Sequence, residues 1–226
     1  MLRELAPGLW VAEQRQRVGG LELGTRMSVV RVGATDLLIH SPISISDELV
    51  EDLGRLGRVR WIVAPNRFHH LHAGPFARRF PDAALLGAPG LGAKRPDLDM
   101  DATLPEGADP KWNGSLDAAL VEGAPLLNEV VFLHRPTRSL IASDLAFNIG
   151  PESPRATRWA FRLLASYDRF GPTRLERLLM RDRAAARRSL ERILAWDFDR
   201  VVIAHGRVLD SGGRDALAAG YAWLLR

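Results

Sequence analysis

Two closely spaced pairs of strand-like runs constrain the fold more than any other feature of the sequence. Met27–Ile39 and Val130–Ala142 each hold two aliphatic stretches separated by a short turn, Gly-Ala-Thr in the first and Arg-Pro-Thr-Arg in the second. This pattern is typical of β-hairpins. Because hairpins are antiparallel, we expect an α/β protein built as a layered sheet sandwich with helices outside, rather than a doubly wound parallel sheet.

Elsewhere the chain alternates between short β-branched or aliphatic runs and segments with helical periodicity. The runs predict strands at Ser28–Val32, Asp36–Ile39, Arg60–Ala64, Ala83–Leu86, Ala118–Val121, Glu129–Leu133, Ser139–Ala142 and Arg200–Ala204. Helices are expected over Leu49–Leu56 after an N-cap at Ser46, over Arg155–Ala165, from the capping box Thr173–Glu176 to about Met180, over Ala184–Ala195, and from about Gly213 to Leu225.

The length and composition fit one domain spanning residues 1–226. Of the 226 residues, 46% are hydrophobic and 26% charged, which is ordinary for a single α/β domain. The absence of cysteine excludes disulfides, thiolate nucleophiles and cysteine-ligated metal sites. No apolar run approaches the roughly 20 residues of a membrane span, and the N-terminus lacks the apolar core of a signal peptide. We therefore expect a cytoplasmic protein with no membrane span.

The charge pattern leaves two interpretations open. The net charge at pH 7 is only +4, which does not require a nucleic-acid partner, and we expect none. The segment from Arg155 to Arg192, however, holds eleven arginines against four acidic residues. It is either a solvated helical face or a patch for an anion, a membrane surface or nucleic acid.

Side chains that can ligate a metal follow four of the predicted strands, at the point where each ends. They are His40 after Asp36–Ile39, then His69, His70 and His72 after Arg60–Ala64, Asp144 after Ser139–Ala142, and His205 after Arg200–Ala204. Converging imidazoles and a carboxylate would repel one another or stay unsatisfied, and a divalent cation resolves both problems. The donors suit zinc, with iron and manganese as alternatives. His134, which stands alone beside a turn, is expected to be a hydrogen-bonded surface residue.

Several motifs along the chain carry a family resemblance. They are Phe68–Phe76 followed by Phe80–Ala83, the hairpin Val130–Leu133 with Leu140–Asp144, Val201–Gly206, and Leu37–Ser41 in place of an Asp-Thr-Gly turn. In this order they resemble the metallo-β-lactamase superfamily. Leu23–Met27, His40–Pro42, Pro65–His70 and Asn128–Phe132 are more closely similar to a branch of it described only as a domain of unknown function. The resemblance implies an αββα sandwich of two mixed β-sheets flanked by helices.

The resemblance also implies a metal site with fewer ligands than the superfamily's usual two-metal site. When the sequence is aligned on Gly74, the superfamily loop His-x-His-x-Asp-His corresponds to Arg67, His69, Leu71 and His72, so its first His and its Asp are missing. A further superfamily ligand, a His, would fall near Ala124-Pro125, where there is none. The metal ligands carried over are His69, His72, Asp144 and His205, and the additional polar groups that can substitute are His70, His40, Asn66 and Glu129.

The function implied by the resemblance is metal-dependent hydrolysis at a degenerate, mononuclear site. One divalent ion, with zinc as the first expectation, would activate water for attack on an ester, amide or phosphoester. Asp144 would orient or deprotonate that water, and Arg67 would stabilise the oxyanion or replace the charge of a missing metal. The substrate would be a small molecule, and Arg67 favours an anionic one. The alternative is a non-catalytic module of the same fold that binds a small anion or a partner. The sequence indicates no oligomeric state.

Overall fold

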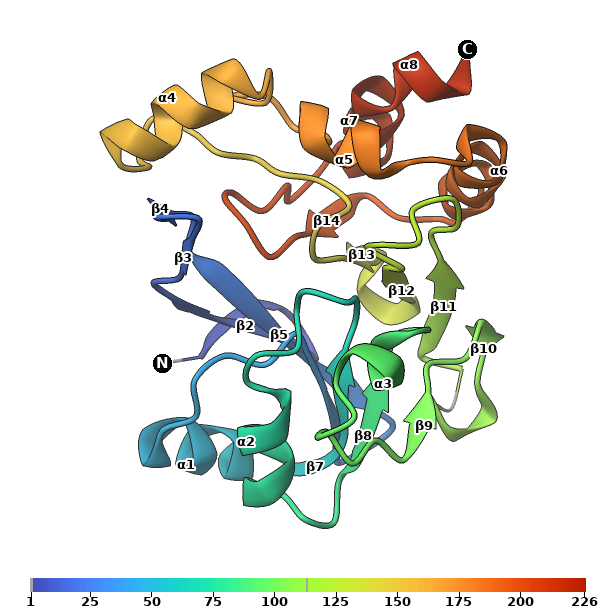
Figure 1. Ribbon diagram of the computed structural model, residues 1–226. Helices are drawn as coiled ribbons and strands as arrows, with labels where there is room; N and C mark the ends of the chain where they lie inside the picture. Colours follow the sequence, from blue (N-terminus) through green and yellow to red (C-terminus); the bar gives the residue numbers. More distant parts are fainter. Residues whose placement is uncertain (1, 113) are drawn as a thin grey trace.

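Two mixed β-sheets packed face to face form the centre of the molecule (Figure 1). The computed structural model describes residues 2–112 and 114–226. The larger sheet has the strand order β1-β2-β5-β6-β7-β8-β9. Its strands are β1 (Arg3–Ala6), β2 (Leu9–Gln14), β5 (Thr25–Val32), β6 (Asp36–His40), β7 (Arg58–Ala64), β8 (Ala84–Gly87) and β9 (Ala102–Thr103). The strands from β1 to β6 pair antiparallel, and those from β6 to β9 pair parallel.

The smaller sheet has the strand order β10-β11-β12-β13-β14. Its strands are β10 (Gly107–Ala108), β11 (Leu116–Leu120), β12 (Val130–His134), β13 (Ser139–Ile141) and β14 (Arg200–Val202). All neighbours are antiparallel except β13 and β14, which are parallel. A separate hairpin of β3 (Arg17–Val18) and β4 (Leu21–Glu22) turns at Gly19-Gly20, both of which have positive φ (55° and 82°), as a two-residue hairpin turn requires.

Helices cover the outer face of each sheet. On the larger sheet lie α1 (Asp47–Leu56), α2 (Ala73–Arg79) and α3 (Leu91–Lys94), and on the smaller sheet lie α6 (Arg183–Leu194), α7 (Gly213–Gly220) and α8 (Ala222–Leu225). Short 3₁₀ turns span Pro110–Trp112 and Arg135–Thr137. α4 (Arg155–Leu163) lies against β4, where Thr157 Oγ1 donates to the Glu22 carbonyl (2.8 Å), and α5 (Arg174–Leu179) follows it. The layers are therefore αββα.

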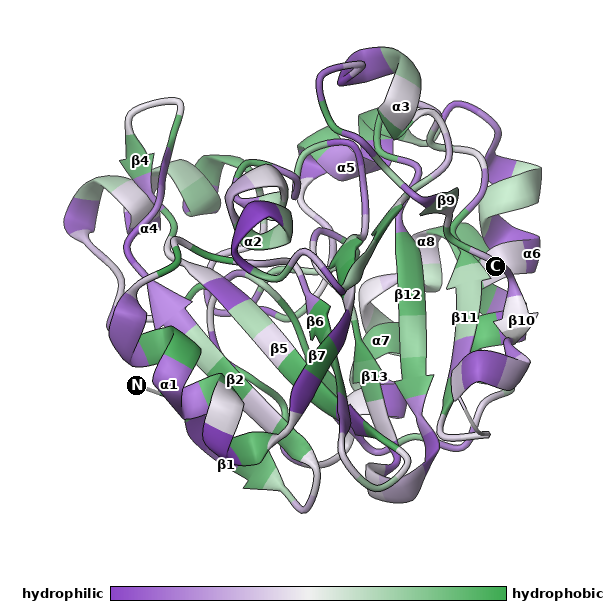
Figure 2. Ribbon diagram, turned by 90° about the horizontal axis from the view of Figure 1, so that it is seen from below, coloured by the Kyte–Doolittle hydropathy of each residue, from purple (hydrophilic) through white to green (hydrophobic). Residues whose placement is uncertain are grey.

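The alternation of side chains along the strands creates three apolar layers. In β6, Leu38 points between the sheets, whereas Leu37 and Ile39 pack under the helices of the larger sheet. In Figure 2 the central strands β11 and β12 are largely hydrophobic, whereas the outer helix α1 mixes hydrophilic and hydrophobic residues. Each fully buried aliphatic side chain contributes roughly 1.5–3 kcal/mol, so this alternation fixes the register of both sheets.

The structure confirms the predicted fold class and both hairpins, β5–β6 and β12–β13. It also confirms the expected helix starts: Ser46 Oγ accepts from the Leu49 amide (3.2 Å), and Thr173 and Glu176 form a capping box before α5. The sequence did not predict the N-terminal strands β1 and β2, because Pro7-Gly8 interrupts their apolar run. The expected last helix is broken after Gly220, which packs against Gly171.

Two of the parallel strand pairs, β6–β7 and β13–β14, explain how the candidate ligands come together. β6 and β7 end side by side, so their carboxyl ends deliver His40 and the loop containing His69 to one edge of the larger sheet. β13 and β14 likewise end together, and Asp144 and His205 follow them. Carboxyl ends of neighbouring parallel strands share one sheet edge, and loops beyond that edge hold converging side chains.

Among the described residues, no helix is long and apolar enough to cross a membrane.

Candidate metal centre

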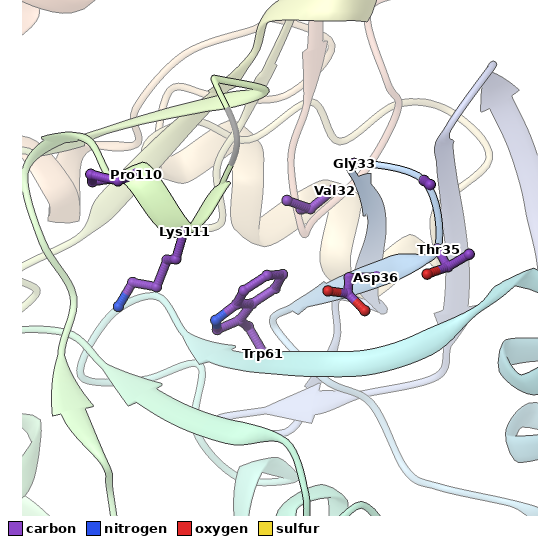
Figure 3. A pocket seen from close by; sticks show the side chains of 8 residues that line it. Val32, Gly33, Thr35, Asp36, Trp61, Pro110 and Lys111 are labelled. Carbon is purple, nitrogen blue, oxygen red and sulfur yellow. The ribbon is translucent and has the colours of Figure 1, made fainter.

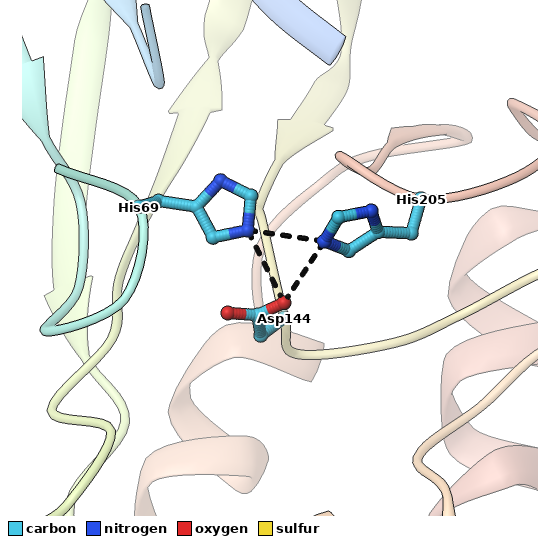
Figure 4. Close-up of side chains that lie close together, drawn as sticks. All are labelled: His69, Asp144 and His205. Carbon is cyan, nitrogen blue, oxygen red and sulfur yellow. Dashed lines mark hydrogen bonds and ion pairs between the residues drawn. The ribbon is translucent and has the colours of Figure 1, made fainter. Parts of the chain in front are cut away.

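Three donor atoms from three different loops meet at this edge of the sandwich (Figure 4). His69 Nε2 lies 3.1 Å from His205 Nε2 and 3.3 Å from Asp144 Oδ1. His205 Nε2 lies 3.4 Å from the same carboxylate oxygen. The two imidazoles therefore turn the same nitrogen toward one point that they share with Asp144.

His205 is oriented by its other ring nitrogen. Nδ1 donates to the Gly24 carbonyl (2.6 Å), and the ring stacks on Phe147 with an interplanar angle of 4°. In the neutral imidazole the proton is therefore on Nδ1, and the Nε2 lone pair is available to a metal ion. Gly206 has φ +89°, and a Cβ there would overlap the Asn148 carbonyl, so only glycine allows the chain to turn directly after His205.

His69 is also held through its Nδ1, by the hydroxyl of Ser41. Its Nδ1 lies 2.7 Å from Ser41 Oγ, and Ser41 has a left-handed backbone with φ 55°. A non-glycine residue in this conformation is strained, and such strain often marks a functional site. Asn66 Oδ1 accepts from the amides of Phe68 (2.8 Å) and His69 (2.7 Å), which fixes the turn that carries the imidazole.

Asp144 is fixed from its backbone and from one carboxylate oxygen. Its Oδ2 accepts from Asn66 Nδ2 (2.8 Å), so Oδ1 is the oxygen that faces the two histidines. The buried carboxylate of Glu129 accepts from the amides of Ser143 (2.6 Å) and Asp144 (2.9 Å). Neither Asn66 nor Glu129 is a donor to the shared point. They position the residues that are.

The charges at this point are strongly coupled. Burial would raise the pKa of Asp144, but the neighbouring His69 and the hydrogen bonds from His205 and His69 hold it well below its usual range. Burial would likewise lower the pKa of His69, yet the Asp144 carboxylate raises it above the ordinary value. Burial, followed by the Asp144 charge, raises the pKa of Glu129 to about 7. The site thus holds a stable carboxylate that attracts positive charge.

The spacing of the three donors fits a tetrahedral metal ion. With metal–donor bonds near 2.0–2.1 Å, two ligands of a tetrahedral zinc ion lie about 3.3 Å apart, and the observed separations are 3.1, 3.3 and 3.4 Å. Three protein donors leave the fourth position open, as in catalytic rather than structural zinc sites. Histidines oriented through Nδ1 are also the usual arrangement around a metal.

Two of the residues expected at the site lie elsewhere. His72 is directed toward Gln14, whose Nε2 lies 3.0 Å from His72 Nε2, and toward Ser44. It does not join the three-donor cluster. Arg67 donates from Nη1 to the Pro125 carbonyl (2.7 Å) and does not line the cavity above the cluster. The structure therefore does not support Arg67 as a group that stabilises an oxyanion, or as a charge that replaces a metal at the cluster.

The remaining histidines of the loop and of β6 are not donors to the shared point either. His70 Nδ1 lies 2.7 Å from Arg95 Nη1, and burial, followed by the charges of Lys94 and Arg95, lowers its pKa to about 4. His40 is buried with its ring edge on Phe132, and burial, followed by the nearby His69, lowers its pKa to about 3. His40 is therefore a neutral residue behind His69.

One family model matches most of the chain. It is described as "Domain of unknown function (DUF4336)" and matches residues 7–169. The chain belongs to the DUF4336 family. No curated protein matches it. The match confirms the prediction that the chain belongs to a family described only as a domain of unknown function.

Solved structures resemble this DUF4336 chain in fold, at low sequence identity. A metallo-β-lactamase from Pontibacter korlensis is 12% identical, with a TM-score of 0.65 over 100% of this chain and 98% of that one. A metallo-β-lactamase from Hirschia baltica is 12% identical, with a TM-score of 0.66 over 100% and 97%. The Flv1 flavodiiron core from Synechocystis sp. PCC6803 is 13% identical, with a TM-score of 0.67 over 99% and 60%. The DUF4336 chain therefore has the metallo-β-lactamase fold.

A cavity of about 630 Å³ opens above the three donors. His69, Asp144 and His205 contribute to its lining, together with the β3–β4 hairpin, the loop after β7, α4 and α5. A second cavity, of about 240 Å³, lies at the opposite end of β6, beside Asp36, Trp61 and Lys111 (Figure 3). Among the described residues, those that line this second cavity include no histidine, so the three-donor cluster of the DUF4336 chain opens into the first cavity.

Sequence reasoning missed two residues of this centre. Arg26 is buried and donates to the carbonyls of Ile203 and Gly206 (2.6 Å for Gly206), on either side of His205, and its guanidinium also binds Glu13 (2.9 Å). Glu176 lines the cavity, and burial raises the pKa of its carboxyl. The capping box revealed where Glu176 lies in its helix, but not that it faces the cavity. No local signal marks the contact of Arg26 with the His205 loop, which is about 180 residues away in sequence.

Five of the eleven arginines in the segment 155–192 of the DUF4336 chain contact acidic or aromatic side chains within the molecule. Arg187 binds Glu191 (2.8 Å) and Arg192 binds Glu122 (3.4 Å). Other guanidinium groups lie over aromatic rings, Arg162 over Tyr167 (4.0 Å) and both Arg177 and Arg183 over Trp223. These contacts favour the interpretation as a solvated helical face over a patch for nucleic acid.

Proposed function

We propose that the protein is a metal-dependent hydrolase of a small-molecule ester, amide or phosphoester, with a mononuclear zinc site in a single domain. The observation that carries the proposal is the convergence of His69 Nε2, His205 Nε2 and Asp144 Oδ1 within 3.1–3.4 Å at the floor of a cavity. Three donors with one open position are the arrangement of a hydrolytic rather than a structural zinc site.

The residues of the site have different roles in the proposed hydrolysis. A bound divalent ion would supply Lewis acidity and lower the pKa of a water molecule toward neutrality. His69 and His205 are oriented through their Nδ1 contacts to Ser41 and Gly24, so that both turn Nε2 toward the shared point. Asp144 is a poor general base, because Oδ1 faces the histidines and Oδ2 is bound by Asn66.

Glu176 is the other carboxyl group that lines the cavity. Its Oε2 is held by the Thr173 amide (3.0 Å), and burial raises its pKa, so this group can exchange a proton closer to neutral pH than an exposed carboxyl. The cavity is also lined by Arg17 and Lys94, which supports an anionic group on the substrate.

The test is metal analysis combined with a hydrolysis screen on protein purified without chelator. We expect about one equivalent of zinc per chain, and turnover of a generic ester or phosphodiester that is lost after chelation and restored by zinc. Less than about 0.2 equivalents of any transition metal, with no uptake on dialysis against zinc, would contradict the proposal.

The rival function is a non-catalytic binding module of the same fold. It is favoured by Leu71, which stands in the aligned position of an aspartate, and by the engagement of both Asp144 oxygens. A metal-loaded protein that binds a small anion, but turns over no ester, amide or phosphoester, would support this alternative.

A further inference from the structure

The walls of the 630 Å³ cavity differ in character from its floor. One wall is the β3–β4 hairpin and the residues after it, which present Val18, Leu21 and Leu23. The opposite wall is formed by α4, α5 and their connection, which present apolar side chains including Phe161 and Leu175. The polar donors of the metal centre lie at the bottom, between an apolar surface near the N-terminus and another formed by residues 155–179.

The apolar lining continues outward to the entrance. Val18, Phe68, Leu71 and Leu175 all line the cavity, and each remains between 48% and 60% exposed. Large apolar side chains that are half-exposed around one opening mark a ligand or interaction site. Because they surround a cavity rather than a flat face, they fit a ligand that enters it.

Three polar groups of the walls are already bound within the protein, whereas Arg17 on the hairpin is exposed to solvent. Glu176 Oε2 accepts from Thr173, His70 contacts Arg95, and Lys94 Nζ donates to the Arg67 carbonyl while lying over the Phe68 ring. They therefore do not require polar partners along the body of a ligand. A polar ligand body would lose its hydration here without replacement, whereas an apolar body would gain by burial.

We propose that this cavity binds the acyl chain of a medium-chain carboxylic ester, with the ester carbonyl next to His69, Asp144 and His205. The volume of 630 Å³ corresponds to about twenty groups of the size of a water molecule, enough for an acyl chain of about eight to twelve carbons and its head. The place of the carbonyl rests on the proposed function, but the binding of the chain does not.

The reaction balances with water as the only co-reactant. The oxygen of water forms a new bond to the carbonyl carbon, and the bond between that carbon and the ester oxygen breaks. The departing alcohol oxygen takes one proton of the water, and the other is released from the carboxylic acid. The products are one carboxylate, one alcohol and one proton.

The first experiment measures binding of straight-chain carboxylates from four to twelve carbons, each below its micelle concentration, by displacement of an apolar fluorophore from the purified protein. Burial of one methylene is worth up to about fourfold in affinity. We expect two- to fourfold per methylene, hence at least about 60-fold between four and ten carbons, with a plateau once the cavity is filled. Less than about a threefold change over that range would overturn the proposal.

A matched pair of variants on α5 separates the cavity from the surrounding surface. Leu175 lines the cavity, whereas Leu178 is three residues further along, 75% exposed, and does not. Leu175→Gln is expected to lower the ratio of ten-carbon to four-carbon affinity at least threefold, and Leu178→Gln to leave it unchanged. Equal effects of both variants would contradict cavity binding. If Leu175→Gln does not fold, Val18→Asn on the opposite wall tests the same expectation.

Hydrolysis of esters of the same chain lengths then separates this inference from the proposed function. Chain-length-dependent binding without any metal-dependent hydrolysis would refute the hydrolase and leave the acyl site standing. Hydrolysis of short esters with no gain in kcat/KM for longer chains would support the hydrolase and refute the acyl site. The proposal would also be overturned if the protein hydrolysed esters in vesicles but not monomeric esters in solution. The site would then recognise a membrane surface.

Discussion

The floor of the cavity is a buried network of polar side chains, whereas its rim consists of half-exposed apolar side chains. At the floor, Asn66, Glu129 and Ser143 are fully or almost fully buried, and each makes directed hydrogen bonds. At the rim, Phe68 and Leu175 are half-exposed apolar side chains that line the cavity. Buried polar networks fix a single geometry because any broken bond is costly, whereas apolar contacts are non-directional.

This difference predicts two kinds of response to substitution. Changes at the floor should act on metal binding and be severe, because the donors must lie within a fraction of an ångström of a common point. Changes at the rim should leave the metal in place and alter the affinity for apolar ligands in small steps. The predictions below test that division, from the largest expected effect to the smallest.

The largest effect is expected for Asp144→Asn. The substitution removes the only charged donor of the cluster, and we expect the affinity for zinc to fall more than about 100-fold, since even partners of metal ligands are worth 10–100-fold. The measurement is competition with a chromogenic zinc chelator. His72→Ala is the matched control: it removes a histidine of the same loop that contacts Gln14 instead, and its affinity should be unchanged. An equal loss in both variants would restore His72 as a ligand.

The contrast between His69 and His72 shows how far the sequence can predict the site. Strand ends located His69, Asp144 and His205 correctly in space, because parallel neighbours end together. The alignment on Gly74 also assigned His72, but two tight turns, from the His70 amide to the Phe68 carbonyl and from the Ala73 amide to the His70 carbonyl, separate it from His69. Spacing alone does not predict the direction in which such a loop turns.

The fold was more predictable than the site because its signals are local. Hairpin turns, an N-cap and a capping box each lie within a few residues, and the structure contains them. Arg26, in contrast, acts on a loop about 180 residues away, and nothing in its own neighbourhood predicts that partner. His134 is a similar case. It keeps the expected hydrogen bond, to Thr137 (2.7 Å), but it is buried rather than at the surface.

The next largest effect is expected for Arg26→Gln. It removes the guanidinium that binds the carbonyls on either side of His205, so His205 should be less well positioned and the zinc affinity should fall about 10–100-fold. The same chelator competition measures it. Arg3→Gln is the control, because Arg3 contacts the same Glu13 carboxylate (3.4 Å) but not the His205 loop. Equal losses in both variants would assign the effect to Glu13 and not to the loop.

A buried histidine beside a carboxylate and a buried histidine without one should contribute to folding stability with opposite pH dependence. Burial lowers the pKa of His134 to about 4, below the 6.5 of the unfolded chain. The unfolded state therefore binds the proton first as the pH falls, and the stability that is complete above about pH 6.5 is lost toward pH 4. For His69, whose pKa is raised, the contribution has the opposite sign: it is present below pH 6.5 and lost as the pH rises.

The measurement is urea unfolding of metal-free protein at pH 7 and pH 5. His134 should account for about 2 kcal/mol of the stability lost between these values, and His134→Gln should reduce the loss by that amount. Thr137→Val removes the hydrogen-bond partner but keeps the titrating ring, so it should retain the loss. A pH dependence that is the same in His134→Gln as in the natural sequence would refute this assignment.

The smallest effect is expected at the rim, for Phe68→Ser. Phe68 lines the cavity and is 48% exposed, so its truncation removes only part of the burial energy of an aromatic ring, and binding of an apolar fluorophore should weaken about three- to tenfold. Zinc stoichiometry should not change. Leu126→Ser is the control, since Leu126 is comparably exposed (42%) but does not line the cavity. Loss of zinc from Phe68→Ser would break the division between floor and rim, because a side chain without a polar atom would then be holding the metal loop in place.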